Sequence, residues 1–113
     1  MDASTQTIYE ALKGVARARQ TCFYGDLSEL IELPAQSRKL YRILDAINAH
    51  EHGEERPLLS ALVVRRGFRI PGDGFFVNAR DLGEYDDSSG DATAHAAFWV
   101  NEVHRIWEYW QDR

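Results

Sequence analysis

The sequence is poor in residues that constrain a chain, with one cysteine, three prolines and one methionine among 113 residues. The single thiol, Cys22, excludes an intramolecular disulfide and a cysteine-based zinc cluster, because both need at least two thiols. No apolar run approaches the roughly 20 residues of a membrane span, and the first residues lack the basic and apolar regions of a signal peptide. We therefore expect a cytoplasmic protein that packing alone stabilises.

Positive charge is also scarce, since 13 Lys and Arg residues face 18 Asp and Glu, for a net charge of −5. This balance argues against a general nucleic-acid coat, whose affinity depends on neutralising phosphates. The charge is unevenly distributed, however. Residues 36–69 hold seven basic and four acidic side chains, and both flanking segments are acidic. The basic side chains are thus concentrated in the middle of the chain.

What the sequence does contain is enough apolar material for one core, with 44% hydrophobic and 12% aromatic residues. The length corresponds to a single domain over residues 1–113. Apolar residues at three- and four-residue steps predict helices over 5–20, over a short stretch ending at Leu33-Pro34, over about 37–53 and over 92–111. Ser37 is the expected N-cap of the third helix.

Between the third and the last helix the composition favours strands. Leu58 to Val64 is β-favouring and apolar, residues 65–69 have the character of a turn, and Gly74 to Val77 is expected to return as a partner strand. Residues 81–90 are polar and predict an exposed connection. Three helices with a tight corner at 33–35 and then a ribbon follow the order of a winged helix-turn-helix. We expect an α+β fold of this type, with a β-hairpin wing and an additional aromatic helix at the C-terminus.

In such a fold the third helix is the reading helix and the hairpin is a basic wing. The exposed face of the helix and the turn then predict an interface with duplex DNA. The cationic residues of this interface are Arg38, Lys39, Arg42, Arg65, Arg66 and Arg69. The alternative for each group is a solvated helix face or hairpin turn. Tyr41, by contrast, is expected to be a packing residue.

Three short motifs resemble a known family. Phe23-Tyr24-Gly25-Asp26-Leu27, then Leu33-Pro34, then Arg38-Lys39-Leu40-Tyr41-Arg42 are similar to the DNA-binding half of alkylguanine-DNA alkyltransferases and alkyltransferase-like proteins. The resemblance spans residue 20 to about 64. It implies that Tyr24 crowds a phosphate of the target nucleotide and that Arg38 fills the space of a flipped base. A hydrophobic-staple role for Tyr24 stays open.

The chain departs from this family at the active site, where Leu59-Ser60-Ala61-Leu62 stands in place of the family's Pro-Cys-His-Arg strand. Because the nucleophilic cysteine and its histidine are missing, alkyl transfer to this chain is excluded on chemical grounds. The segments 60–64 and 71–76 also resemble small bacterial proteins of unknown activity. We expect a non-enzymatic protein with no catalytic residue, metal or cofactor.

The C-terminal helix suggests another function. Three tryptophans, Trp99, Trp107 and Trp110, lie on or near one stripe of this helix and either join the core or present a surface for a partner protein or a second copy. An interaction module, or a subunit of a nucleic-acid-processing or defence complex, is therefore the alternative to DNA binding.

Overall fold

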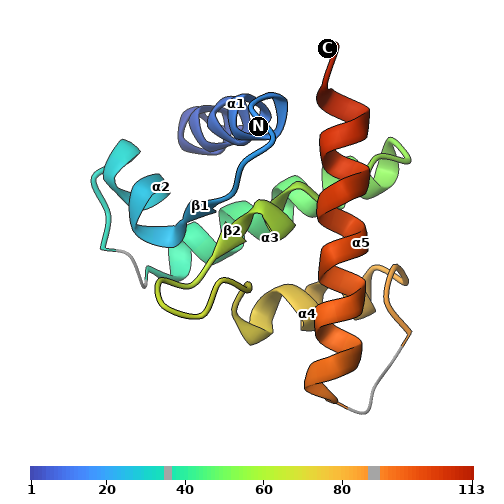
Figure 1. Cartoon of the computed structure of the whole chain (residues 1–113). Coiled ribbons are helices and arrows are strands. Elements are labelled where there is room, and N and C mark those ends of the chain that lie inside the picture. The colour runs from blue at the N-terminus through green and yellow to red at the C-terminus, as the bar shows by residue number, and fades with distance from the viewer. Residues whose placement is uncertain (35–36, 87–89) are drawn as a thin grey trace.

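The computed structural model describes residues 1–34, 37–86 and 90–113 and is mostly helical (Figure 1). Its elements in chain order are α1 (Ala3–Arg17), β1 (Cys22–Phe23), α2 (Tyr24–Leu30), α3 (Arg38–Gly53), the 3₁₀ helix η1 (Leu59–Leu62), β2 (Val63–Val64), α4 (Asp73–Asp81) and α5 (Ala92–Trp110). The Ser37 hydroxyl accepts a hydrogen bond from the Lys39 N–H at 3.1 Å, which confirms Ser37 as the cap of α3. The helices expected near the two ends of the chain are confirmed as well.

The core lies where α1, α3, α5 and η1 meet. Helix α1 packs on α3 and η1, and α5 packs on α1 and η1 (Figure 1). Each helix buries the apolar stripe that its periodicity predicts, such as Ile8 and Leu12 of α1, Leu40 and Ile47 of α3, and Ile106 of α5. The segment Leu58–Val64 runs through the centre and is buried throughout. This arrangement leaves the N-terminal turns of α3 and the loop after β2 at one side of the molecule.

The expected winged fold is wrong. Across the described residues, the sheet consists of two two-residue strands, β1 and β2, which pair in parallel with Cys22 opposite Val63 and Phe23 opposite Val64. A hairpin needs antiparallel strands, and residues 65–72 instead lead into helix α4. The basic segment 65–69 is therefore a loop and not the tip of a β-ribbon.

Helix α4 occupies the place of the expected second strand. Gly74 to Val77 is rich in β-favouring aromatic and branched residues, which explains the wrong assignment. The packing decides otherwise, because Phe75, Phe76 and Ala79 are buried on one helical face against the core. Most of the expected strand 58–64 is likewise the 3₁₀ helix η1, with β2 reduced to its last two residues.

Two expected connections fall partly on residues 35 and 87–89, which lie outside the described residues. Of the helices that the structure does describe, none combines the length and the apolar character needed to cross a bilayer.

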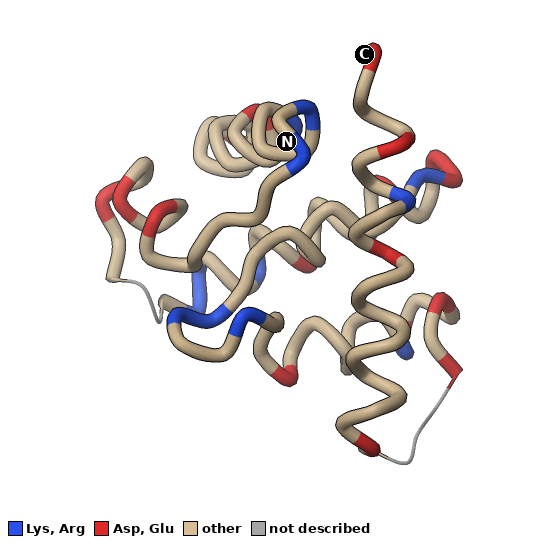
Figure 2. Tube along the Cα trace, in the orientation of Figure 1, with Lys and Arg blue, Asp and Glu red and all other residues tan. Residues whose placement is uncertain are grey.

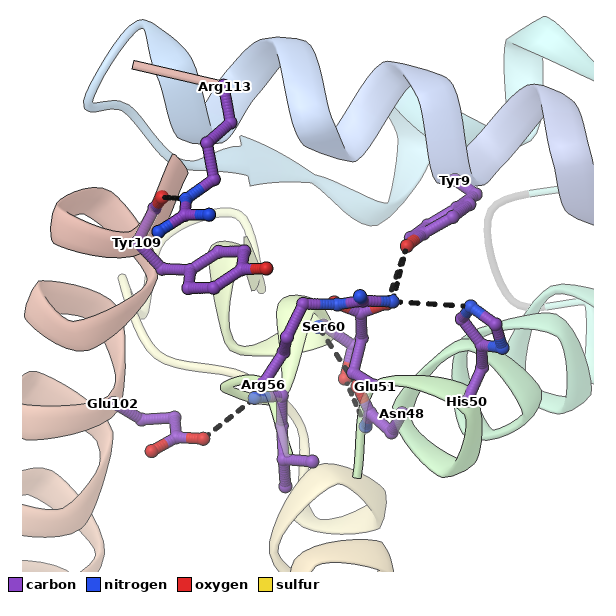
Figure 3. Close-up of polar contacts among 10 residues, drawn as sticks. Tyr9, Asn48, His50, Glu51, Arg56, Ser60, Glu102, Tyr109 and Arg113 are labelled. Carbon is purple, nitrogen blue, oxygen red and sulfur yellow. Dashed lines mark hydrogen bonds and ion pairs between the residues drawn. The ribbon is translucent and has the colours of Figure 1, made fainter. Parts of the chain in front are cut away.

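Buried polar groups stabilise the contacts between helices (Figure 3). The Glu51 carboxylate of α3 is fully buried. It accepts hydrogen bonds from the Tyr9 hydroxyl at 2.6 Å and from the Arg56 Nε at 2.9 Å. On α5 the buried Glu102 accepts the backbone N–H of Leu58 at 2.8 Å. These contacts join α1 to α3, and α5 to the segment that leads into η1.

Candidate nucleic-acid interface

The first turns of α3 present three cations to solvent. Arg38, Lys39 and Arg42 are exposed, because Leu40, Ile43 and the other apolar positions take up the opposite, buried face. None of the three cations forms an ion pair with a residue in the described ranges. The charges of Arg38 and Arg42 are therefore available to an external anion, while that of Lys39 also acts on the nearby Asp2 carboxylate.

The second basic segment is the loop that follows β2. The Arg65 N–H donates to the Ile70 carbonyl at 2.9 Å, and the Phe68 N–H donates to the Arg65 carbonyl at 3.1 Å, so the loop closes on itself. Gly67 has φ +88° and Arg69 has φ +56°, the left-handed conformations that this tight reversal requires. The closed loop holds the Phe68 side chain 66% exposed.

A groove of about 360 Å³ separates the two segments; we call it the aromatic groove. Its lining comes from β1, α2, α3 and the loop after β2: Phe23, Tyr24, Gly25, Tyr41, Arg65, Arg66 and Phe68. The Arg65 guanidinium carbon lies 4.4 Å from the Phe68 ring centroid, and that of Arg66 lies 4.2 Å from the Phe23 centroid. Figure 2 shows the basic residues of α3 and of the loop gathered in this region. The groove thus pairs arginines with aromatic rings.

Tyr24 lines both the aromatic groove and a second hollow. The hollow has a volume of about 220 Å³ and is lined by Tyr24, Tyr41, Leu44, Ser60, Gly72, Asp73, Gly74 and Phe75. The Tyr24 ring lies edge-on to Tyr41 with centroids 5.6 Å apart, and its hydroxyl accepts the Gly72 N–H at 3.0 Å. Burial raises the pKa of Tyr24, so the hydroxyl keeps its proton at neutral pH. The O–H group can therefore donate to a ligand while its oxygen holds the Gly72 loop.

Ser60 is buried and lines the second hollow. Its hydroxyl accepts a hydrogen bond from the Asn48 amide at 2.7 Å, and its N–H donates to the Asn48 side-chain oxygen at 3.1 Å. The same amide also donates to Asn78 of α4 at 2.9 Å. These bonds join η1, α3 and α4, and give Ser60 a role in holding the hollow together.

The structure brings together some of the residues that the sequence singled out. Tyr24, Arg65 and Arg66 line the aromatic groove, whereas Arg38, Lys39, Arg42 and Arg69 lie outside its lining. Sequence reasoning missed Phe23 and Phe68, and it assigned Tyr41 to packing although that ring is 42% exposed. A signal for Tyr41 was present, since it falls beside Arg38 and Arg42 and off the buried stripe of its helix.

The three tryptophans are held largely within the chain. Trp110 is buried, with 7% of its surface exposed. Trp99 and Trp107 are half-buried, and their indole N–H groups donate to the Ala61 carbonyl at 2.7 Å and to the Gln20 carbonyl at 3.1 Å. These contacts fix α5 to η1 and to the segment before β1, so the core interpretation accounts for most of the aromatic stripe.

The other reactive groups among the described residues do not gather into a site. Burial, followed by the charge of Asp26, raises the pKa of the Cys22 thiol to about 12, so the thiolate is not formed at neutral pH. In the described part of the chain, no three His, Cys, Asp or Glu side chains are grouped to hold a metal ion.

Comparisons with models of protein families, with curated proteins and with solved structures find no match for this chain.

Proposed function

We propose that this protein binds duplex DNA without catalysis, through the first turns of α3 and the loop after β2. The observation that carries the proposal is the placement of six exposed cations on two segments that face each other across the aromatic groove. None of the six forms an ion pair within 4 Å among the described residues, and only Lys39 lies near enough to an acidic group, Asp2, to lower the pKa of its carboxyl. Phosphate neutralisation by such free cations is the main source of DNA affinity.

The charge pattern of the rest of the molecule supports this location. Elsewhere several basic side chains are already engaged, including Lys13 with Glu10, Arg56 with Glu51 and Arg105 with Glu102. The net charge of −5 repels a polyanion from the molecule as a whole. Only a surface on which unpaired cations are concentrated can attract one. The alternative of a protein-binding aromatic face has less support, because Trp99 and Trp107 donate their N–H groups within the chain.

The test is a fluorescence-anisotropy titration of labelled duplex DNA at two salt concentrations. Replacing one phosphate-contacting cation, in Arg38→Ala or Arg65→Ala, should weaken binding and lower the slope of log affinity against log salt by about 0.9. Arg113→Ala is the matched control, because this exposed arginine lies at the C-terminus, away from the loop after β2 (Figure 1), and makes the same change in net charge.

Salt-sensitive binding that Arg65→Ala loses and Arg113→Ala retains would support the proposal. The absence of binding at low salt, or an equal loss in the Arg113→Ala variant, would overturn it.

A further inference from the structure

The lining of the aromatic groove indicates whether the bound DNA is paired or single-stranded. This further inference rests on the proposed DNA binding and on the exposure of two aromatic rings in the groove. Phe68 is 66% exposed and Tyr41 is 42% exposed, and both rings line the same groove. Exposed apolar side chains that gather in one groove are typical of a binding site. The loop closed by the Arg65 and Ile70 backbone holds Phe68 outward against the hydrophobic effect. Flat exposed rings beside arginines are how proteins stack unpaired bases.

The arginines of the groove add to this preference. The guanidinium groups of Arg65 and Arg66 lie over the rings of Phe68 and Phe23. An arginine that stacks on an aromatic ring can still use its N–H groups to bind an anion. Such an edge suits a phosphate, and the neighbouring ring suits the base attached to that phosphate. The groove therefore offers contacts to both parts of a single nucleotide strand. The bases of a blunt duplex are stacked inside the helix and cannot use the rings.

Acidic residues near the groove disfavour a ligand with two phosphate backbones. Asp45 follows Tyr41 by one turn of α3, and Asp73 lines the second hollow. On the other side, the exposed Asp26 lies in the first turn of α2, and its carboxylate accepts the Phe23 N–H at 3.0 Å. Figure 2 shows acidic residues on α2 and at the start of α4 on either side of the basic loop. These carboxylates disfavour a second phosphate backbone beside the one bound in the groove.

We propose that the preferred ligand is DNA with an unpaired segment, a single strand whose bases stack on Phe68 and Tyr41 while its phosphates contact Arg65 and Arg66. Binding of a blunt duplex then uses the cations alone. This assigns the aromatic groove to the unpaired strand and the first turn of α3 to the adjoining backbone.

The experiment compares one labelled oligonucleotide of mixed sequence, offered as a single strand and as a blunt duplex with its complement, at the same salt. The single strand should bind about tenfold more tightly or better. Phe68→Leu, which keeps an apolar side chain but removes the ring, should weaken single-strand binding by about tenfold and leave duplex binding within about twofold. Leu30→Ala is the control, because Leu30 is also exposed and lies outside the groove. A thermal unfolding curve for each variant verifies that the fold is kept.

The outcomes separate the two proposals. If the duplex binds as tightly as the single strand, or if Phe68→Leu weakens both equally, the preference for an unpaired segment is overturned, while a loss with Arg65→Ala still supports DNA binding. If neither form binds, or Arg65→Ala changes neither, both proposals fall.

Discussion

At the scale of single residues, the interior depends on a few fully buried polar groups. Glu51 is the clearest example, since its carboxylate has no exposed surface and accepts from both Tyr9 and Arg56 (Figure 3). A buried carboxylate without such donors would be strongly destabilising. The sequence shows that these three residues exist, but nothing in their spacing shows that α1, α3 and the loop at residue 56 bring them together. Long-range polar contacts of this kind had to be read from the structure.

The Tyr9 hydroxyl predicts how stability changes in alkaline solution. Burial, and then the hydrogen bond to Glu51, raises the pKa of Tyr9 from 10.0 to about 12. The neutral phenol is therefore favoured in the folded state, so its contribution is complete below pH 10 and is lost as the pH rises toward 12. Tyr9→Phe should be less stable than the parent protein by about 1.5–3 kcal/mol at neutral pH, because the lost hydrogen bond is to a carboxylate, and the difference should shrink between pH 10 and 12.

Urea unfolding of both proteins at a series of pH values checks this. Tyr24 and the other titrating groups are present in both proteins, so the difference isolates Tyr9. A difference that stays constant up to pH 12 would contradict the assignment.

At the scale of elements, amphipathic periodicity predicted the long helices well, because burial of one stripe is what makes them form. It failed where two structures compete for the same residues. Phe75, Phe76 and Val77 read as a strand, yet Phe75, Phe76 and Ala79 pack as one face of α4. Because there is no wing, the basic residues 65–69 are presented to the proposed interface by a closed loop. The cations of the proposed surface could therefore be predicted from the sequence. Its aromatic lining could not, because it depends on a loop geometry that the sequence pattern did not specify.

The geometry of that loop predicts a contrast between two glycines. Gly67 has φ +88°, so Gly67→Ala forces an alanine into the left-handed region and should destabilise the protein by about 1–2 kcal/mol. Gly14 lies within α1, and a methyl group added there would meet no atom within 4 Å. Gly14→Ala should therefore stabilise the protein by about 0.5–1 kcal/mol. Thermal or chemical unfolding measures both; similar effects of the two substitutions would show that the loop is not held in this conformation.

At the scale of the whole molecule, the basic and acidic residues that are separated along the sequence are also separated in the folded structure. Six basic side chains of the central segment lie at one side, and the acidic third is mostly helix α5 and the segments before it. The tryptophans that suggested a partner surface instead help attach α5 to the body of the protein through Ala61 and Gln20. Helices α1, α2, α3 and α5 and their order were predictable, whereas α4 was taken for a strand and the mutual arrangement of the helices depends on contacts between residues distant in the chain.

The hydrogen bond by which Glu102 attaches α5 to Leu58 leads to a further prediction. Glu102 is fully buried and accepts the Leu58 N–H at 2.8 Å and the Arg105 guanidinium at 2.6 Å. Glu102→Ala leaves the Leu58 N–H without an acceptor and should lower the free energy of unfolding by about 2–3 kcal/mol. Glu102→Gln retains an acceptor oxygen and should cost about 1 kcal/mol. Urea denaturation distinguishes the two, and an equal loss in both would mean that the carboxylate charge, rather than the acceptor, is what matters.

The parallel pairing of Cys22 with Val63 and of Phe23 with Val64 determines which parts of the chain are needed for the proposed surface. This pairing sets the aromatic rings that precede and begin α2 beside the arginines that follow β2. An isolated peptide spanning α3 would carry Arg38, Lys39 and Arg42 without the groove, and a peptide spanning the loop would carry Arg65 and Phe68 without Tyr24. The surface therefore exists only as a property of the folded chain and cannot be transferred to another protein as a linear segment.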